Sequence, residues 1–162
     1  MSILEDAFAM ADAEANPTLP RVSSKQQLFN DSTWDRQRGN YEATVFASAA
    51  RTTTTNSSDI TNYNARGARF TLDITAASGT SPTLDVKMQM KDTLSGKYVD
   101  IASAVFAQKT TTGTDELILY PGVAETANES VSDILPRVYR AVATIAGTTP
   151  SFTFTLTANY VN

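Results

Sequence analysis

The chain has 162 residues, of which 41% are hydrophobic and 19% charged, a composition typical of a globular domain with its own hydrophobic core. Its net charge of −4, from 13 Lys and Arg against 17 Asp and Glu, argues against a nucleic-acid-binding protein that works by neutralising phosphates. The absence of cysteine excludes disulfide bonds and thiolate metal sites, and no apolar run reaches the ~18–20 residues that a membrane span requires.

Residues 2–15 are predicted to form a short amphipathic helix. Ser2 and Glu5 have the spacing of a capping box, and Leu4 and Phe8 fall on one helical face. Pro17 ends the helix, because the residue before a proline is pushed out of the helical region. A helix of about 14 residues is only marginally stable in water, so we expect it to need a surface to lie on.

Residues 17–40 have no sustained periodicity and are predicted to be extended, so that residues 1–40 together form an N-terminal arm. Burying five of its large apolar side chains, those of Leu4, Phe8, Leu28, Phe29 and Trp34, would contribute roughly 7–15 kcal/mol. Ordering about 40 residues costs on the order of 1–2 kcal/mol per residue, so these anchors cannot order the arm alone. We expect the arm either to wrap its own domain or to bind a neighbouring subunit or lattice. The candidate contact residues are Leu4, Phe8, Leu28, Phe29, Trp34, Arg36 and Arg38.

Residues 41–162 show a hydrophobic period of 2, which predicts an all-β domain of about seven or eight short strands. Most of the 24 threonines lie in this region, where a β-branched side chain suits a pleated surface. Helix-like pattern is confined to residues 124–132. We therefore predict an antiparallel β-sandwich, either a jelly roll or an immunoglobulin-like Greek key. The predicted strands are 41–49, 70–74, 84–90, 98–101, 117–120, 139–145 and 152–160.

Candidate catalytic groups are few, because histidine is absent and every Ser-His-Asp triad is thereby excluded. Asp73 with Asp85, and Asp115 with Glu116, could form the carboxylate pair of a glycosidase. The first two acids lie in alternating polar rows that also contain basic residues, so a solvated sheet face is the preferred interpretation.

Two further patterns have ordinary structural explanations. The segment 95–97 (Ser-Gly-Lys) is similar to the end of a phosphate-binding loop, but position 91 is lysine instead of the required glycine, so a hairpin turn is preferred. Glu125, Glu129 and Asp133 lie four residues apart without the sequence of a calcium-binding loop. We predict no catalytic residue, no metal site and no cofactor.

Several turn sequences carry a resemblance to a known group of proteins. They are 62–67 (Asn-Tyr-Asn-Ala-Arg-Gly), followed by 70–75, then 78–87, 95–98, 119–122 (Leu-Tyr-Pro-Gly) and 135–137 (Leu-Pro-Arg). Over roughly residues 43–161 the chain resembles small structural proteins of tailed bacteriophages and prophages. The resemblance covers the β region and not the arm, and it implies a fold and a virion context without any catalytic residue.

The resemblance implies a capsid decoration, or cement, protein. Such a protein would form a homotrimer, bind the major capsid protein on the capsid surface, and be made in the cytoplasm of the bacterial host. Its arm would bind adjacent capsid subunits and hold them together. Binding to nucleic acid or to a membrane is not expected. Two alternatives remain: a phage tail or neck component, and a glycan-binding adhesin module that uses loops such as 52–64 or 110–114. An enzyme is not expected.

Overall fold

The computed structural model describes residues 27–29, 34–36 and 41–161. They belong to two compact units, Met1–Gly39 and Asn40–Asn162. Every regular element of the described residues is a β-strand, which confirms the all-β prediction. None of these residues belongs to a helix that could cross a membrane. The predicted helix 2–15 lies outside the described residues.

The first unit contains one small sheet. Strands β1 (Gln27–Phe29) and β2 (Trp34–Arg36) pair antiparallel, with Phe29 opposite Trp34. The extended chain predicted for residues 17–40 is therefore paired with itself over these six residues.

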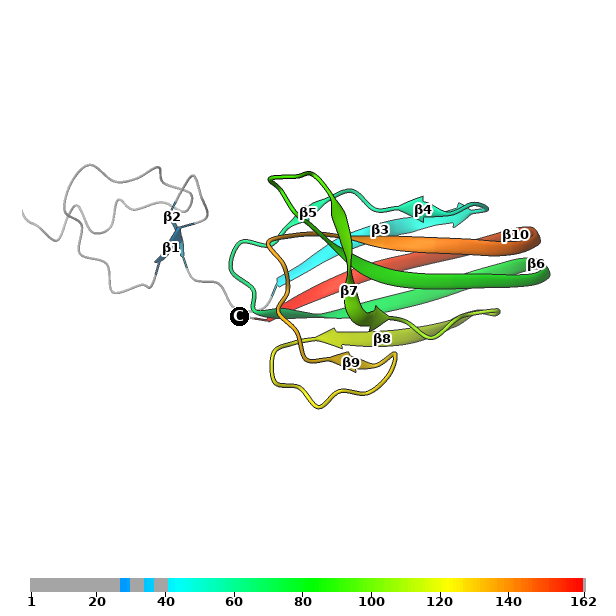
Figure 1. Ribbon diagram of the computed structural model, residues 1–162. Helices are drawn as coiled ribbons and strands as arrows, with labels where there is room; N and C mark the ends of the chain where they lie inside the picture. Colours follow the sequence, from blue (N-terminus) through cyan, green and yellow to red (C-terminus); the bar gives the residue numbers. More distant parts are fainter. Residues whose placement is uncertain (1–26, 30–33, 37–40, 162) are drawn as a thin grey trace, which may run out of the picture. The chain divides into compact units, whose positions relative to one another are not determined.

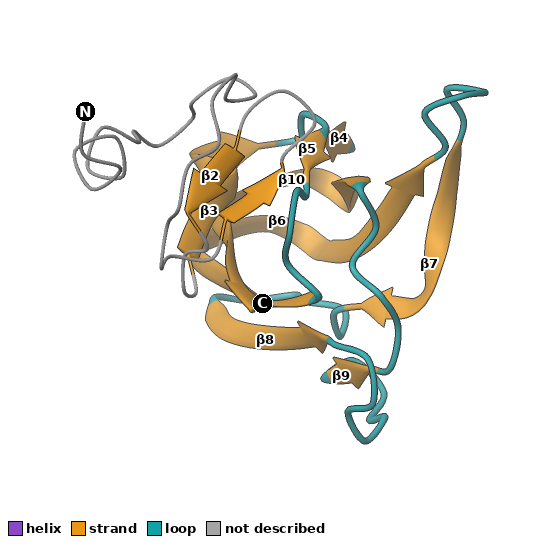
Figure 2. Cartoon of the chain, turned by 90° about the vertical axis from the view of Figure 1, so that its left-hand side faces the viewer, coloured by secondary structure: helices purple, strands orange, loops and turns teal. Residues whose placement is uncertain are grey.

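The second unit is a single mixed sheet of eight strands. The strands along its main path follow the order β3-β10-β6-β8-β9, while β4 and β5 pair with β10 and β7 pairs with β6. In Figures 1 and 2, β4 and β5 lie at the upper side of the unit and β8 and β9 at its lower side. The strand bounds are β3 (Tyr41–Arg51), β4 (Thr55–Asn56), β5 (Ile60–Thr61), β6 (Gly67–Lys91), β7 (Tyr98–Val105), β8 (Gly113–Leu119), β9 (Ser130–Val131) and β10 (Val138–Val161).

Two very long strands, β6 and β10, organise this sheet. They pair antiparallel from Val161 opposite Gly67 to Tyr139 opposite Met90, with register shifts near the middle. At that middle point the two-stranded ribbon turns back on itself, so that its two halves face each other (Figure 1). The sequence predicted four separate strands here, which is wrong, because the chain bends without ending the ladder.

The bend is built from two similar four-residue segments that differ only at their third residue. Residues 79–82 (Gly-Thr-Ser-Pro) and 147–150 (Gly-Thr-Thr-Pro) lie opposite each other, with Thr148 paired to Thr80. Both glycines have positive φ, at 117° and 121°, and the third residue of each segment has φ of 49°. A Cβ on Gly147 would lie 2.7 Å from the Ser81 carbonyl oxygen, so the two segments pack backbone to backbone. Positive φ and close approach are the two conditions that favour glycine.

The core lies between the two facing halves of the ribbon. Alternate side chains of each half point inward, as strand periodicity requires. The aromatic side chains Phe152, Phe154 and Tyr160 of β10 are all buried there. Their largest fully buried companions are Tyr139, Phe70, Leu72, Leu84, Met88, Leu117, Leu119, Leu156 and Val86.

The prediction of an antiparallel sheet fails at one place. Strands β8 and β9 pair parallel, with Ile118 opposite Ser130 and Leu119 opposite Val131. The chain between them turns tightly, closed by hydrogen bonds between Thr126 and Ser130, and then returns beside the end of β8. This path buries Val131, which explains why residues 124–132 form a turn and a short strand instead of a helix.

Candidate functional site

Two of the turn sequences singled out above, 62–67 and 135–137, meet at one junction in the described domain. Its centre is Asn62, one of two polar side chains in the described residues that are buried. The Asn62 side-chain amide donates to the Ala65 and Leu135 carbonyl oxygens at 2.8 and 3.1 Å, and its Oδ1 accepts from the Ala65 N–H at 2.9 Å. One side chain thus ties the 62–67 turn to the 135–137 segment.

Backbone hydrogen bonds reinforce the same junction. The Asn62 N–H donates to the Arg137 carbonyl at 2.7 Å, and the Leu135 N–H donates to the Arg66 carbonyl at 3.2 Å. On the surface of the junction, the Arg137 guanidinium lies 5.7 Å from the centre of the exposed Tyr63 ring. Because the polar groups of Asn62 are satisfied internally, these motif residues build the fold and leave no open binding site at its centre.

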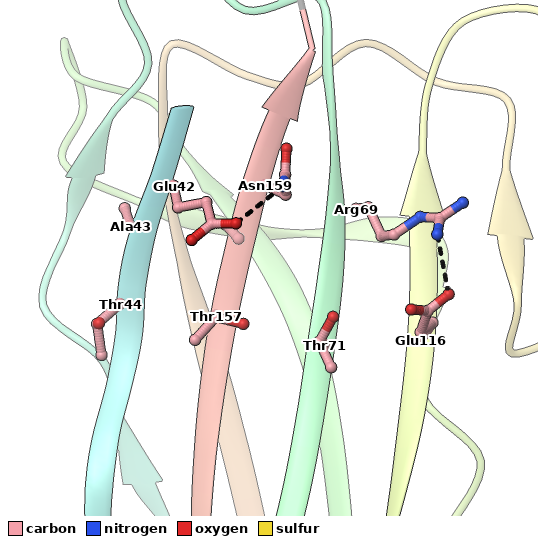
Figure 3. Close-up of a pocket in the computed structure, with 9 residues that line it drawn as sticks. Glu42, Ala43, Thr44, Arg69, Thr71, Glu116, Thr157 and Asn159 are labelled. Carbon is pink, nitrogen blue, oxygen red and sulfur yellow. Dashed lines mark hydrogen bonds and ion pairs between the residues drawn. The ribbon is translucent and has the colours of Figure 1, made fainter. Parts of the chain in front are cut away.

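A shallow groove lies on the outer face of the sheet (Figure 3). It has a volume of about 430 Å³ and crosses four neighbouring strands. Side chains of alternate residues project into it, because those residues face away from the core. Its polar lining residues are Glu42 and Thr44 from β3, Thr157 and Asn159 from β10, Arg69 and Thr71 from β6, and Glu116 from β8.

The charged side chains of this groove are bonded to one another. Arg69 forms an ion pair with Glu116 at 3.3 Å, and the Asn159 amide donates to Glu42 at 3.1 Å. Both members of the ion pair are about half exposed, so water screens their attraction. The groove offers hydroxyls and paired charges, but no aromatic ring on which a sugar could stack.

A second groove of about 550 Å³ lies beside β8 and the 127–129 turn. Lys109 and Asp115 line it and form an ion pair with each other. No group of three or more acidic residues suited to a metal ion occurs in the part of the chain that the structure describes.

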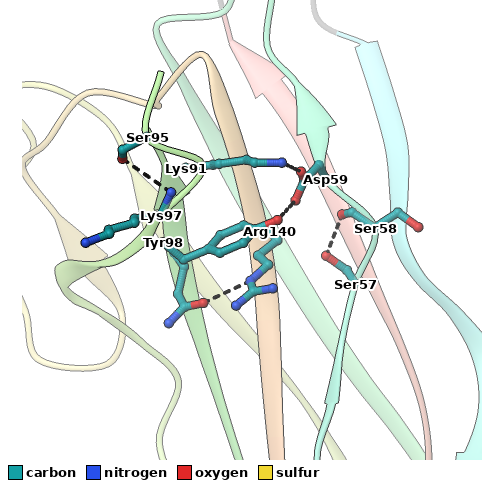
Figure 4. A network of polar contacts seen from close by, with 9 residues as sticks. Ser57, Ser58, Asp59, Lys91, Ser95, Lys97, Tyr98 and Arg140 are labelled. Atoms are coloured by element: carbon teal, nitrogen blue, oxygen red, sulfur yellow. Dashed lines mark hydrogen bonds and ion pairs between the residues drawn. The ribbon is translucent and has the colours of Figure 1, made fainter. Parts of the chain in front are cut away.

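The densest polar network lies on the outer face of the other half of the sheet (Figure 4). Asp59 accepts hydrogen bonds from Lys91 at 2.6 Å and from the Tyr98 hydroxyl at 2.8 Å. Arg140 stacks on the Tyr98 ring at 3.4 Å and donates to Gln89 at 2.9 Å. The Lys91 and Tyr98 hydrogen bonds lower the pKa of Asp59, and the Asp59 hydrogen bond raises the pKa of Lys91. The network therefore keeps both charges in place and clamps β6, β7 and β10 to the β4–β5 connection.

The candidate carboxylate pairs are not brought together. Asp73 accepts from the Thr114 hydroxyl at 2.8 Å and Asp85 accepts from Gln108 at 3.0 Å, in the two different halves of β6. Asp115 and Glu116 are consecutive in β8 and have different partners, Lys109 and Arg69.

The other candidate groups also have structural partners. In the 92–97 turn, the Asp92 carboxylate accepts from the Leu94 N–H and the Ser95 hydroxyl, and Gly96 has a φ of 72°. This is the predicted hairpin joining β6 to β7. Glu125 accepts from the Ser132 N–H at 3.3 Å.

The predicted contact residues of the arm are only partly placed. Leu28, Phe29, Trp34 and Arg36 belong to β1 and β2. Leu4, Phe8 and Arg38 lie outside the described residues.

Sequence reasoning missed a tyrosine cluster at the end of the domain where β3 begins, in which Tyr139 and Tyr160 are buried and Tyr41 is partly exposed. The Tyr139 and Tyr160 hydroxyls are hydrogen bonded to each other, and the Tyr41 ring stacks on Tyr160 with centroids 4.4 Å apart. Burial raises the pKa of all three phenols. The available signal was tyrosine, instead of phenylalanine, at two core positions of β10, since a buried hydroxyl needs a partner.

The described domain is thus a set of internally satisfied polar clusters around a folded sheet. Comparison with protein-family models, with curated proteins and with solved structures found no match for this chain.

Proposed function

We propose that this chain is a structural protein of a bacteriophage virion, a capsid decoration (cement) protein that stabilises the head. It would be made in the host cytoplasm, form a homotrimer and bind the major capsid protein on the capsid surface. The arm would reach neighbouring capsid subunits and hold them together.

The observation that carries the proposal is the junction around Asn62. Two of the turn sequences that resemble phage structural proteins, 62–67 and 135–137, are hydrogen-bonded to each other there as parts of the fold. A resemblance carried by such fold-building turns is what a shared architecture with that group would produce.

The ionisation of the acidic groups also favours a structural role. In Asp59, Asp92 and Asp100, hydrogen bonds to side chains or backbone N–H groups lower the pKa. A general acid needs a raised pKa, usually from burial or a neighbouring negative charge. These three carboxylates are instead held ionised, as partners in surface bonds.

We further propose that the folded sheet acts as a sandwich of the jelly-roll type. The close backbone packing at the bend and the side chains buried between the halves support this interpretation. A block of this kind resists deformation, which suits a protein whose task is to oppose the separation of capsid subunits under the pressure of packaged DNA.

An electron-microscopy map of an intact particle that contains this protein tests the assignment. We expect density for the folded domain at regular positions over the head, with three copies at each position. Density confined to the tail or neck would contradict the capsid decoration hypothesis and favour a tail or neck component. Absence from purified particles, together with saccharide binding by the recombinant chain on a glycan array, would favour the adhesin alternative.

A further inference from the structure

Four segments of the described domain, two loops and the two bend segments within β6 and β10, lie together where β6 and β10 bend. They are residues 52–55, 78–81, 110–113 and 146–149, which we call the hydroxyl end. The strand pairing places them together, because Arg51 is opposite Phe152, Gly113 is opposite Ile74 and Thr148 is opposite Thr80. Figure 1 shows the bend and these loops at the right-hand end of the domain.

The hydroxyl end contains no charged residue. Its sixteen residues are ten threonines, two serines, three glycines and one alanine, and all except the half-buried Thr55 are exposed. Charged residues make up 19% of the whole chain, so sixteen residues of average composition would carry about three charges. The 20 charged residues of 41–161 all lie elsewhere in the domain.

Such a surface is suited to being buried against another surface. Charged side chains are depleted at the centres of protein interfaces, because removing them from water is costly. Threonine and serine lose less side-chain entropy on burial than lysine, arginine or glutamate. Each hydroxyl can both donate and accept a hydrogen bond. The same hydroxyl-covered surface on two copies can therefore form hydrogen bonds across the contact.

The chemistry of the hydroxyl end also limits the kind of partner. Nucleic acid requires basic residues, a membrane requires large apolar or basic ones, and sugar binding usually uses aromatic rings. The hydroxyl end contains no basic, aromatic or large apolar residue. Elsewhere, residues 41–161 carry 9 basic and 11 acidic side chains, so two copies repel weakly through the rest of the surface. The end without charges is where two copies can approach without like-charge repulsion.

We propose that the hydroxyl end is the surface through which copies of this chain associate with one another. The inference rests on the proposed oligomer and deepens it, by naming the contact surface. Association through this surface is insensitive to salt, since no ion pair takes part in it.

The test measures the mass of the full-length chain in solution by light scattering after size-exclusion chromatography. We expect the wild type to have two or three times the mass of one chain. A Thr53→Lys/Thr112→Lys variant should be monomeric, because it brings like charges together at the contact. The matched control Thr93→Lys/Ala124→Lys, which adds the same charge at exposed positions outside the hydroxyl end, should keep the wild-type mass.

Charge reversal separates a lost contact from a lost fold. Mixing the Thr53→Lys/Thr112→Lys variant with a Thr53→Glu/Thr112→Glu variant should restore association, now in a salt-dependent manner. A monomeric wild type at all concentrations, an oligomeric lysine variant, or a control variant that dissociates would each overturn the inference. Binding of the chain to phage heads is a separate measurement, so a failure of this inference can be distinguished from a failure of the proposed function.

Discussion

Single residues in this protein are distinguished by how completely their polar groups are satisfied. Asn62 uses both its side-chain oxygen and its nitrogen on backbone groups of two separate segments. Arg51 offers a second example. Its guanidinium stacks on the Phe46 and Phe154 rings and donates to the Ala47, Ala49 and Phe154 carbonyl oxygens. The sequence shows both residue types, but the carbonyl groups that they bind become neighbours only through the fold.

Asn62→Ala should destabilise the domain strongly. The substitution leaves the Ala65 N–H and two buried carbonyl oxygens without their partner, which we expect to cost about 2–3 kcal/mol of unfolding free energy. Urea denaturation followed by circular dichroism measures the change. Asn64→Ala, at an exposed position in the same turn, should stay within about 0.5 kcal/mol of the wild type. Equal stabilities for the two variants would show that the Asn62 hydrogen bonds do not stabilise the junction.

The tyrosine cluster predicts a loss of stability in alkali. Burial raises the pKa values of Tyr139 and Tyr160 in the folded protein, so above about pH 10 the unfolded chain releases protons that the folded chain retains. The unfolding free energy should then fall by about 1.4 kcal/mol per pH unit for each such tyrosine. Below about pH 10 these groups are protonated in both states and add no pH dependence.

Tyr139→Phe isolates this effect from the titration of lysine side chains. The variant should be less stable at neutral pH, because the Tyr160 hydroxyl loses its hydrogen-bond partner. Above about pH 10 its unfolding free energy should fall less steeply with pH than that of the wild type, by the contribution of one tyrosine, about 1.4 kcal/mol per pH unit. Urea denaturation at a series of alkaline pH values, alongside phenolate absorbance, gives both slopes. Identical slopes for variant and wild type would mean that Tyr139 ionises normally in the folded protein.

At the scale of elements, the sequence predicted that the domain consists of β-strands better than it predicted how those strands are connected. Period-2 patterns placed strand residues in β3, β6, β7, β8 and β10 but missed the two-residue strands β4, β5 and β9, and the hairpin predicted at 92–97 is present. The Gly-Thr-Ser-Pro and Gly-Thr-Thr-Pro segments contain typical loop residues, which by themselves indicate strand ends. Their positive φ angles instead bend the ribbon while hydrogen bonding continues on both sides. The local sequence indicates where the chain changes direction, but it does not show that the hydrogen bonds between β6 and β10 continue on both sides of the bend.

Gly147→Ala should disrupt the bend. The new Cβ would lie 2.7 Å from the Ser81 carbonyl oxygen and 3.0 Å from the Pro82 Cα, at a φ of 121° that alanine rarely adopts. We expect a loss of at least about 3 kcal/mol, or failure to fold.

Gly96→Ala provides the matched control for this prediction. Its φ of 72° is also left-handed, but nothing lies within 4 Å of the added Cβ, so the cost should be about 1 kcal/mol. Thermal unfolding compares the two variants directly. A Gly147→Ala variant as stable as Gly96→Ala would show that the two bend segments are not packed tightly together.

At the scale of the whole molecule, the sequence predicts a β domain over residues 41–162 and an N-terminal arm over residues 1–40. What could not be predicted was the hydroxyl end, because its four segments are far apart in the chain. Each segment alone is an ordinary hydroxyl-rich stretch, and the absence of charge becomes informative only when they are brought together.

The central claim, that the arm binds the capsid while the folded domain stands independently, is tested by deleting residues 1–38. The truncated chain and the full-length chain are each added to purified heads that lack this protein, and their occupancy is measured after sedimentation. Circular dichroism checks that the truncated domain is folded. We predict that the full-length chain saturates the heads, while the truncated chain is folded and soluble but does not bind. Equal occupancy by the two chains would contradict this claim.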